Sequence, residues 1–191
     1  MTDTFTPAQE RTVIEDTQKW LLEAVVGLNL CPFAKAVVVK DMVRYRVCGS
    51  SQPADLLAML REELQHLAAA DPEKLDTTLL IAPKALPDFL DFNDFLAECD
   101  DVLMDLELDG VLQVADFHPL YQFGGTDVDD IENFTNRTPY PTLHLLREAS
   151  IDKAVEAYPD ASLIFERNMQ VLNKLGHQGW SKLGIVSRLH N

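Results

Sequence analysis

The sequence predicts an α/β fold: a small, open, mainly parallel sheet of three to four strands with helices around it. Three segments, at 37–48, 77–83 and 110–119, have the apolar and β-branched residues of strands. Segments with apolar residues every three or four positions separate them, which is typical of amphipathic helices. Strands joined by helices pair in parallel through right-handed crossovers. The 191 residues suit one domain, 1–191, large enough to bury a core without disulfides.

The first half of the chain alternates between the two kinds of element. A helix is predicted to begin at Pro7, after the capping residue Thr6, and to end near Gly27. The segment VVVKDMVRYRVC (37–48) predicts one strand or a hairpin. A hairpin would favour the alternative fold, an α+β protein with a ferredoxin-like layer. Regularly spaced leucines at 56–67 predict the second helix.

The second half begins with TTLLIAP (77–83), a strand apolar enough to be covered on both faces. A third helix follows Pro87; its apolar stripe includes Cys99, which we therefore interpret as a core residue. Its five carboxylates lie on another face and are interpreted as solvated. After the strand at 110–119, helical segments are predicted at 127–134 (a short turn), 141–149, 151–157 and 161–175.

The charge distribution excludes some kinds of partner. The net charge is −15, and residues 85–136 contain fourteen Asp or Glu and no Lys or Arg. Such an acidic chain repels phosphate backbones, so we expect no nucleic-acid binding. No apolar run has the length of a membrane span, and the N-terminus does not resemble a signal peptide, so we expect a cytoplasmic protein with no membrane partner. Three widely spaced cysteines indicate reduced thiols.

One polar segment, FHPLYQFGGTDVDDIENFTNR (117–137), follows the last predicted strand. Its His118 stands at the carboxyl end of that strand, where open α/β sheets bind ligands. Imidazole titrates near neutrality, so His118 is the predicted catalytic acid or base. Tyr121 and Asn136 would orient the substrate. The alternative is a structural histidine that hydrogen-bonds to a backbone carbonyl.

The next segment, TNRTPYPTLHLLRE (135–148), supplies positive charge. Pro141 can begin a helix that carries His144 and Arg147 three positions apart, and Arg137 lies just before it. Two arginines near a helix N-terminus could hold a carboxylate or phosphate. The alternative is that they pair with neighbouring Asp and Glu.

Cys31, in GLNLCPFAK (27–35), is the candidate nucleophile. A cysteine at a helix cap has a lowered thiol pKa, whereas a buried cysteine is inert, and both interpretations remain open. If Cys31 lay beside His118, the two would form a credible nucleophile and base.

No cofactor is indicated by the motifs. The chain lacks G-x-S-x-G, Walker, G-x-G-x-x-G and H-E-x-x-H patterns. The segment after Thr126 lacks the glycine and terminal glutamate of a calcium loop. A hard-metal site formed by His118, Asp127 and Asp130 is a further alternative.

Five stretches together resemble a known family: GLNLCPFAK, TTLLIAP, FHPLYQF, DDIENFTNRTPYPTLHLLRE and LGHQGW. The chain resembles the domain-of-unknown-function family numbered 1415, from about Trp20 to Trp180. The resemblance implies neither an activity nor a cofactor. It does imply that the residues within these stretches share a site, namely Cys31, His118, Tyr121, Asn136, Arg137, Tyr140, His144 and Arg147.

We therefore expect an enzyme that acts on a small anionic metabolite, with acid–base chemistry at His118. The rival hypothesis is a non-enzymatic interaction protein whose acidic 85–136 region meets a basic partner. A metal-dependent enzyme is the third. The sequence indicates neither a substrate nor an oligomeric state.

Overall fold

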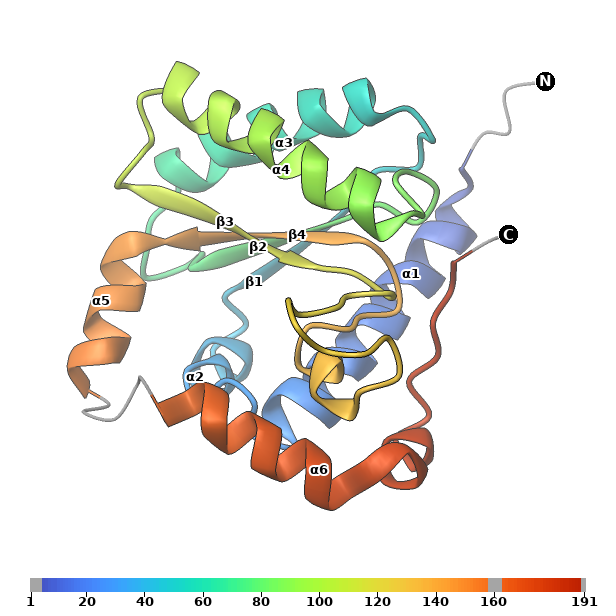
Figure 1. Ribbon diagram of the computed structural model, residues 1–191. Helices are drawn as coiled ribbons and strands as arrows, with labels where there is room; N and C mark the ends of the chain where they lie inside the picture. Colours follow the sequence, from blue (N-terminus) through green and yellow to red (C-terminus); the bar gives the residue numbers. More distant parts are fainter. Residues whose placement is uncertain (1–4, 158–162, 190–191) are drawn as a thin grey trace.

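The computed structural model has a four-stranded open sheet at its centre, with helices on both faces (Figure 1). It describes residues 5–157 and 163–189. In chain order the elements are α1 (Pro7–Trp20), the π-helical η1 (Leu21–Val26), α2 (Ala34–Val39), β1 (Val43–Val47), α3 (Pro53–Ala69), β2 (Thr77–Ile81), α4 (Phe89–Asp105), β3 (Leu112–Phe117), the 3-10 helix η2 (Ile131–Thr135), β4 (Thr142–Arg147), α5 (Glu148–Ala157) and α6 (Ile164–Lys182).

The sheet confirms the predicted α/β class with an open sheet of four strands. Its order is β1-β2-β4-β3. Strands β1 and β2 are parallel, and β4 is antiparallel to both β2 and β3. The three strands expected from the sequence therefore run in one direction. The sheet is nevertheless mixed, not mainly parallel, because β4 runs against them from a central position.

Strand β4 replaces the helix predicted at 141–149, and this prediction was wrong. Leu143 and Leu145 face one helical layer and are fully buried, while His144 faces the other layer. A short run that is apolar on both faces suits a strand or a buried helix equally well by sequence. Pairing with β2 along one edge and β3 along the other favours the strand. It provides hydrogen-bond partners for backbone groups that would otherwise be buried without them.

The segment 37–48 is neither a full strand nor a hairpin. Only Val43–Val47 pairs in the sheet, while the valines before it belong to α2. The change of direction occurs at Asp41, whose φ is +56°. Val37 and Val38 line a cavity under the sheet. Their tertiary packing outweighs the modest strand preference of β-branched residues.

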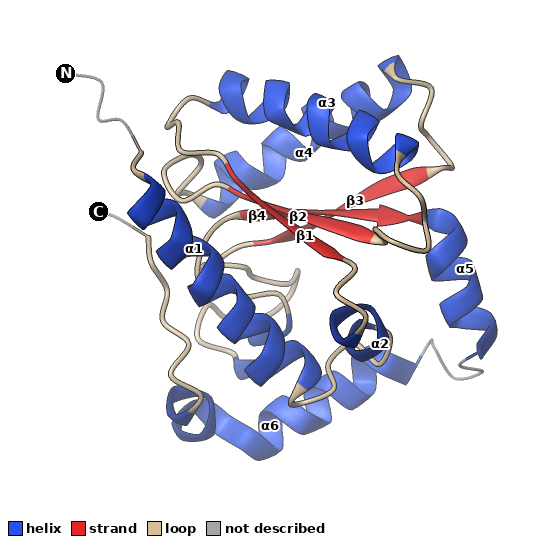
Figure 2. Cartoon of the chain, turned by 180° about the vertical axis from the view of Figure 1, so that it is seen from behind, coloured by secondary structure: helices blue, strands red, loops and turns tan. Residues whose placement is uncertain are grey.

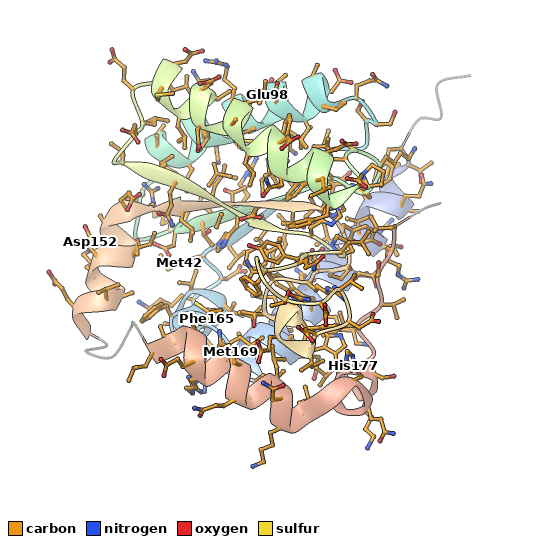
Figure 3. All side chains as sticks on the ribbon, in the orientation of Figure 1. Met42, Glu98, Asp152, Phe165, Met169 and His177 are labelled. Atoms are coloured by element: carbon orange, nitrogen blue, oxygen red, sulfur yellow. The ribbon has the colours of Figure 1, made fainter. Side chains whose placement is uncertain are left out.

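Two helical layers enclose the sheet (Figures 1 and 2). Helices α3 and α4 cover one face, with a core that includes Leu56, Leu60, Phe92 and Cys99, as the predicted stripes require. Helices α1, α2 and α6 lie on the other face, around a second core. The acidic residues of α4 are exposed, and Glu98 points away from the sheet (Figure 3).

The predicted helix boundaries agree with local chemistry. Thr6 forms a capping box with Gln9 at the start of α1, and its Oγ1 accepts from the Gln9 N–H at 3.2 Å. The expected stop at Gly176 is a break, with φ of 62°, inside α6. Within the two described ranges, no helix is both long enough and apolar enough to cross a membrane.

Arg147 joins the end of β4 to the end of α3. Its Nη2 donates to the carbonyl oxygens of Leu67 (2.6 Å), Ala70 (3.0 Å) and Leu75 (3.1 Å), and its Nε donates to Leu75 at 3.2 Å. The last carbonyls of a helix have no partner within it, so one guanidinium here caps α3. These donors point to the backbone and not to an anion.

Replacing Arg147 with Met should lower the free energy of unfolding by about 1–3 kcal/mol, because partly buried carbonyls lose their donors. Urea unfolding measures the change. Arg61→Met is the matched control, since Arg61 forms an exposed ion pair with Asp105. That control should change stability by less than about 1 kcal/mol. Equal midpoints for the two variants would contradict the capping role of Arg147.

Candidate functional site

The segment predicted as the active site, 118–137, is closed upon itself by hydrogen bonds. The Oδ1 atom of Asn133 accepts from the Phe123 N–H (3.0 Å) and from the Thr126 hydroxyl (2.8 Å). Its Nδ2 donates to the carbonyl of Asp127 at 2.8 Å. Asn133 is fully buried. Its amide therefore holds the loop from inside.

His118 is fully buried and both of its ring nitrogens are occupied. Nε2 donates to the Leu86 carbonyl at 3.1 Å, and Nδ1 accepts from the Leu120 N–H at 3.0 Å. The ring also packs against Phe89 and Phe92. Burial lowers the pKa of His118 to about 4, so the ring is neutral near pH 7. With no nitrogen left for a substrate, the geometry favours the structural alternative for this histidine.

Arg137 is directed at the same loop. Its Nε donates to the Tyr121 carbonyl (3.0 Å) and its Nη2 to the Val128 carbonyl (2.7 Å). The guanidinium lies over the ring of Phe134, 4.6 Å from its centre. The fork formed by Nε and Nη2, which was expected to hold an anion, binds the backbone instead.

Three further predicted binding residues, Tyr121, Asn136 and Tyr140, also have structural partners. The ring of Tyr121 packs against Phe123, with ring centres 5.0 Å apart. The backbone carbonyl of Asn136 accepts a hydrogen bond from the backbone N–H of His118 at 3.1 Å. The hydroxyl of Tyr140 donates to Asp16 on α1 at 2.8 Å.

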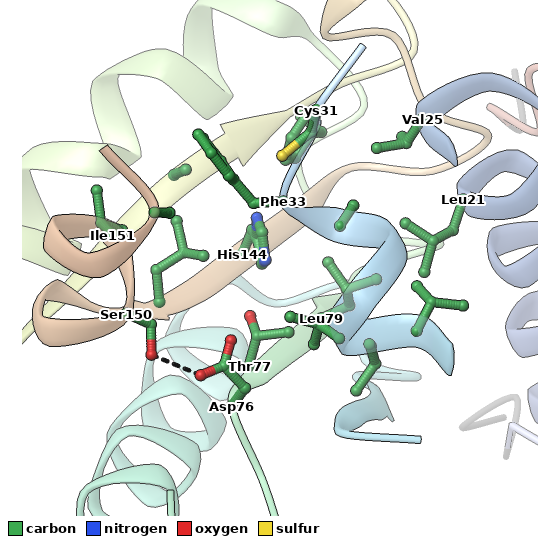
Figure 4. Close-up of a pocket in the computed structure, with 18 of the residues that line it drawn as sticks. Leu21, Val25, Cys31, Phe33, Asp76, Thr77, Leu79, His144, Ser150 and Ile151 are labelled. Carbon is green, nitrogen blue, oxygen red and sulfur yellow. Dashed lines mark hydrogen bonds between the residues drawn. The ribbon is translucent and has the colours of Figure 1, made fainter. Parts of the chain in front are cut away.

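A cavity of about 320 Å³ lies on the side of the sheet that faces α1, α2 and α6, opposite α3 and α4 (Figure 4). Its walls come from the sheet, η1, α2 and α5, and most of the residues that line it are apolar. The side chains that carry polar atoms or sulfur are Trp20, Cys31, Asp76, Thr77, Gln113, His144 and Ser150. This cavity is the candidate functional site.

His144 projects into the cavity from the middle of the sheet. In the register it lies between Leu79 on β2 and Ala115 on β3, and its ring is 5.9 Å from that of Phe117. Among the described residues, neither ring nitrogen has a hydrogen-bond partner. Burial lowers the pKa of His144 to about 4, so it is neutral near pH 7. A neutral imidazole offers the cavity one donor and one acceptor.

Cys31 is partly exposed and lines the same cavity. Its sulfur and the His144 ring face a common space (Figure 4). The other thiols differ: Cys48 and Cys99 are buried, and burial raises the pKa of Cys99 to about 12. Cys31 therefore shares a cavity with His144 and not with His118.

Three of the other polar side chains in the cavity, Ser150, Asp76 and Thr77, have hydrogen-bond partners. The Ser150 hydroxyl donates to Asp76 at 2.6 Å, and the Thr77 hydroxyl donates to the Leu145 carbonyl at 2.6 Å. Within the described residues, His144, Cys31, Gln113 and the Trp20 indole have no such partner. Of these, His144 projects from the middle of the sheet, and Cys31 faces the same space. The sequence analysis missed this face because it placed His144 on a helix, on the same side as Arg147. On a strand, residues three apart point to opposite faces.

The metal-site alternative has no matching geometry. The Oδ2 atom of Asp130 accepts from the Asp127 N–H at 2.8 Å within the loop, and His118 is bonded to the backbone. Within residues 5–157 and 163–189, no three His, Cys, Asp or Glu side chains are grouped so that they could hold a metal ion.

A family model described as a protein of unknown function (DUF1415) matches residues 12–182. The chain belongs to this family. The match confirms the resemblance carried by the five motifs. Comparisons with curated proteins and with solved structures find no match. The function of this DUF1415 chain must therefore be inferred from its cavity.

Two histidines, buried His118 and partly buried His144, predict how stability depends on pH. Their pKa values fall from 6.5 in the unfolded chain to about 4 in the fold, so below pH 6.5 the unfolded chain binds protons that the folded chain does not. The stabilisation is complete above pH 6.5 and is lost as the pH falls toward 4. Between pH 7 and 5 each histidine should account for a loss on the order of 2 kcal/mol.

Urea unfolding of His144→Phe at several pH values tests this expectation. The decline from pH 7 to 5 should be smaller than in the wild type, because one titrating group is gone. His66→Gln, at an exposed position on α3, should decline as the wild type does. An unchanged pH dependence in His144→Phe would show that its imidazole titrates normally in the fold.

Proposed function

We propose that this chain binds a small, largely apolar molecule in the cavity under the sheet, with neutral His144 as the polar group that recognises it. The observation that carries the proposal is an imidazole without a hydrogen-bond partner, facing a mostly apolar space. His144 is only partly buried and its ring nitrogens are open to the cavity, where one hydrogen bond contributes about 0.5–1.5 kcal/mol net. A ligand that hydrogen-bonds to His144 would gain that free energy.

The dimensions of the cavity support a small-molecule ligand. A volume of about 320 Å³ lies at the lower end of the range for ligand pockets, which are mostly apolar with a few placed polar groups. Apolar contact would supply most of the affinity, at about 25 cal/mol for each Å² removed from water. One hydrogen bond to His144 would then fix the orientation of the ligand.

Charge favours an uncharged ligand over the anionic metabolite expected from the sequence. No Arg or Lys is among the described residues that line the cavity. Its one carboxylate, Asp76, already accepts a hydrogen bond from Ser150. An anion would lose its hydration without gaining a cation. The proposal keeps a small-molecule ligand and a histidine that recognises it, but this histidine is His144 and not His118.

The interaction-protein hypothesis concerns a different surface. The acidic residues of α4 are exposed on the side of the sheet opposite the cavity, so a basic partner there would not compete with a ligand near His144. That hypothesis stays a prediction, and the cavity can be tested without it.

The proposal predicts that uncharged, apolar fragments raise the thermal midpoint more than carboxylates or phosphates of similar size. A fragment at about a hundred times its Kd adds roughly 2.7 kcal/mol to the stability of the wild type. Ala115→Leu, which extends a side chain into the cavity beside His144, should abolish the shift. His144→Phe should weaken binding about five- to tenfold, the value of one hydrogen bond.

His66→Gln serves as the matched control, since His66 is exposed on α3 and lies outside the cavity. It should bind fragments as the wild type does. Binding that survives Ala115→Leu unchanged would place the ligand elsewhere. A preference for anions would restore the anionic metabolite as the leading hypothesis.

A further inference from the structure

We infer that Cys31 is a nucleophile that accepts an acyl group from an uncharged ester, with His144 as the group that takes and returns the thiol proton. This inference rests on the proposed function, because the substrate would occupy the same cavity.

The first support is the direction of the thiol. The Cys31 side chain is partly exposed, lines the cavity and points its sulfur into the space that the His144 ring enters (Figure 4). Of the chain's three cysteines, Cys48 is buried in the core beneath α3 and α4, and so is Cys99. Only Cys31 among them could meet a substrate in the cavity.

The second support is the anchoring of the Cys31 backbone. The Nδ2 atom of Asn168, which is 4% exposed on α6, donates to the carbonyl of Leu30 at 2.8 Å. The Ala34 N–H donates to the carbonyl of Cys31 at 3.2 Å. A nucleophile fixed on both sides keeps its orientation, which is what a reaction between positioned groups requires. We assign Asn168 as a positioning residue.

The third support is the state of the imidazole. Neutral His144 has one ring nitrogen with a free lone pair, and no described side chain occupies it. The low pKa of His144, about 4, makes a lasting thiolate–imidazolium pair unfavourable in the apolar cavity. The proton should therefore move as the bond to sulfur forms, a pattern of general base catalysis.

The reaction balances without a cofactor. The Sγ atom of Cys31 bonds to the carbonyl carbon while its proton passes to His144. The ester C–O bond then breaks, and the departing alkoxide takes that proton, which leaves an acyl thioester on Cys31. Water attacks the thioester, gives a proton to His144, and the expelled thiolate receives it back. The net reaction converts an ester and water into a carboxylic acid and an alcohol.

The walls of the cavity select the acyl group. Residues such as Leu21, Val25 and Ile151 offer an apolar surface with no fixed cation. Each added methylene that fits should raise kcat/KM about fourfold, the equivalent of burying one CH₂. The gain should stop when the cavity is full.

The test follows 4-nitrophenyl acetate, butyrate and hexanoate with the full chain, by release of nitrophenolate and by intact mass. Wild type should gain one acyl group, mapped to the peptide that contains Cys31, and Cys31→Ala should gain none. His144→Phe should acylate about 10²- to 10⁴-fold more slowly. His66→Gln should match the wild type. Asn168→Ala should lower kcat, because the hydrogen bond to the Leu30 carbonyl is lost. Asn168→Asp keeps the shape of the side chain but lacks the Nδ2 donor, so kcat should stay low.

Binding of butyl 4-nitrophenyl ether, which cannot acylate a thiol, separates this inference from the proposed function. If the ether binds, but no acyl group appears on Cys31 and the wild type releases nitrophenolate no faster than Cys31→Ala, the nucleophile is overturned while the ligand site stands. If neither is seen, both fall. Acylation of Cys31 at the same rate in His144→Phe would remove the histidine from the reaction.

Discussion

The pairing of β4 along both edges is the interaction on which the rest of the structure depends. With β2 on one side and β3 on the other, β4 joins strands that the chain otherwise connects only through α4. Its alternating side chains then serve both layers: Leu143 and Leu145 complete the core under α3 and α4, while His144 enters the cavity opposite. Arg147, at its end, caps α3.

The contrast between buried His118 and partly buried His144 shows that a lowered pKa alone does not identify a site. Burial lowers the pKa of both His118 and His144, so both are neutral near pH 7. His118 gives both nitrogens to backbone groups of Leu86 and Leu120, which makes it part of the framework. His144 has no such partners among the described residues. An unsatisfied polar group in a cavity is the stronger indication of a ligand.

The predicted site residues divide according to what their polar atoms bind. His118, Asn136 and Arg137 close one loop through backbone groups, and Arg147 closes a helix end. Side chains rich in donors are useful for holding irregular backbone, because buried carbonyls and N–H groups need partners. A segment with many polar side chains can therefore arise because its backbone needs hydrogen-bond partners. Cys31 and His144 are the two candidates that the fold leaves facing a cavity.

The sequence by itself determined the α/β class, three strands of common direction, the leucine face of α3, the inner stripe of α4 and the core position of Cys99. These follow from periodicities that need only local information: which residues repeat, and where a cap or glycine interrupts them. It also drew attention to Cys31 and His144 among eight candidates.

Only the tertiary structure decided that residues 142–147 form a strand, and with it which histidine shares a cavity with Cys31. The sequence TLHLLR is compatible with a strand and with a helix. The hydrogen bonds that favour the strand are made with β2 and β3, which lie tens of residues away in the chain. Once the strand forms, its two-residue period separates His144 from Arg147 and turns the histidine toward the cavity. Long-range pairing, which local sequence does not encode, placed the candidate site.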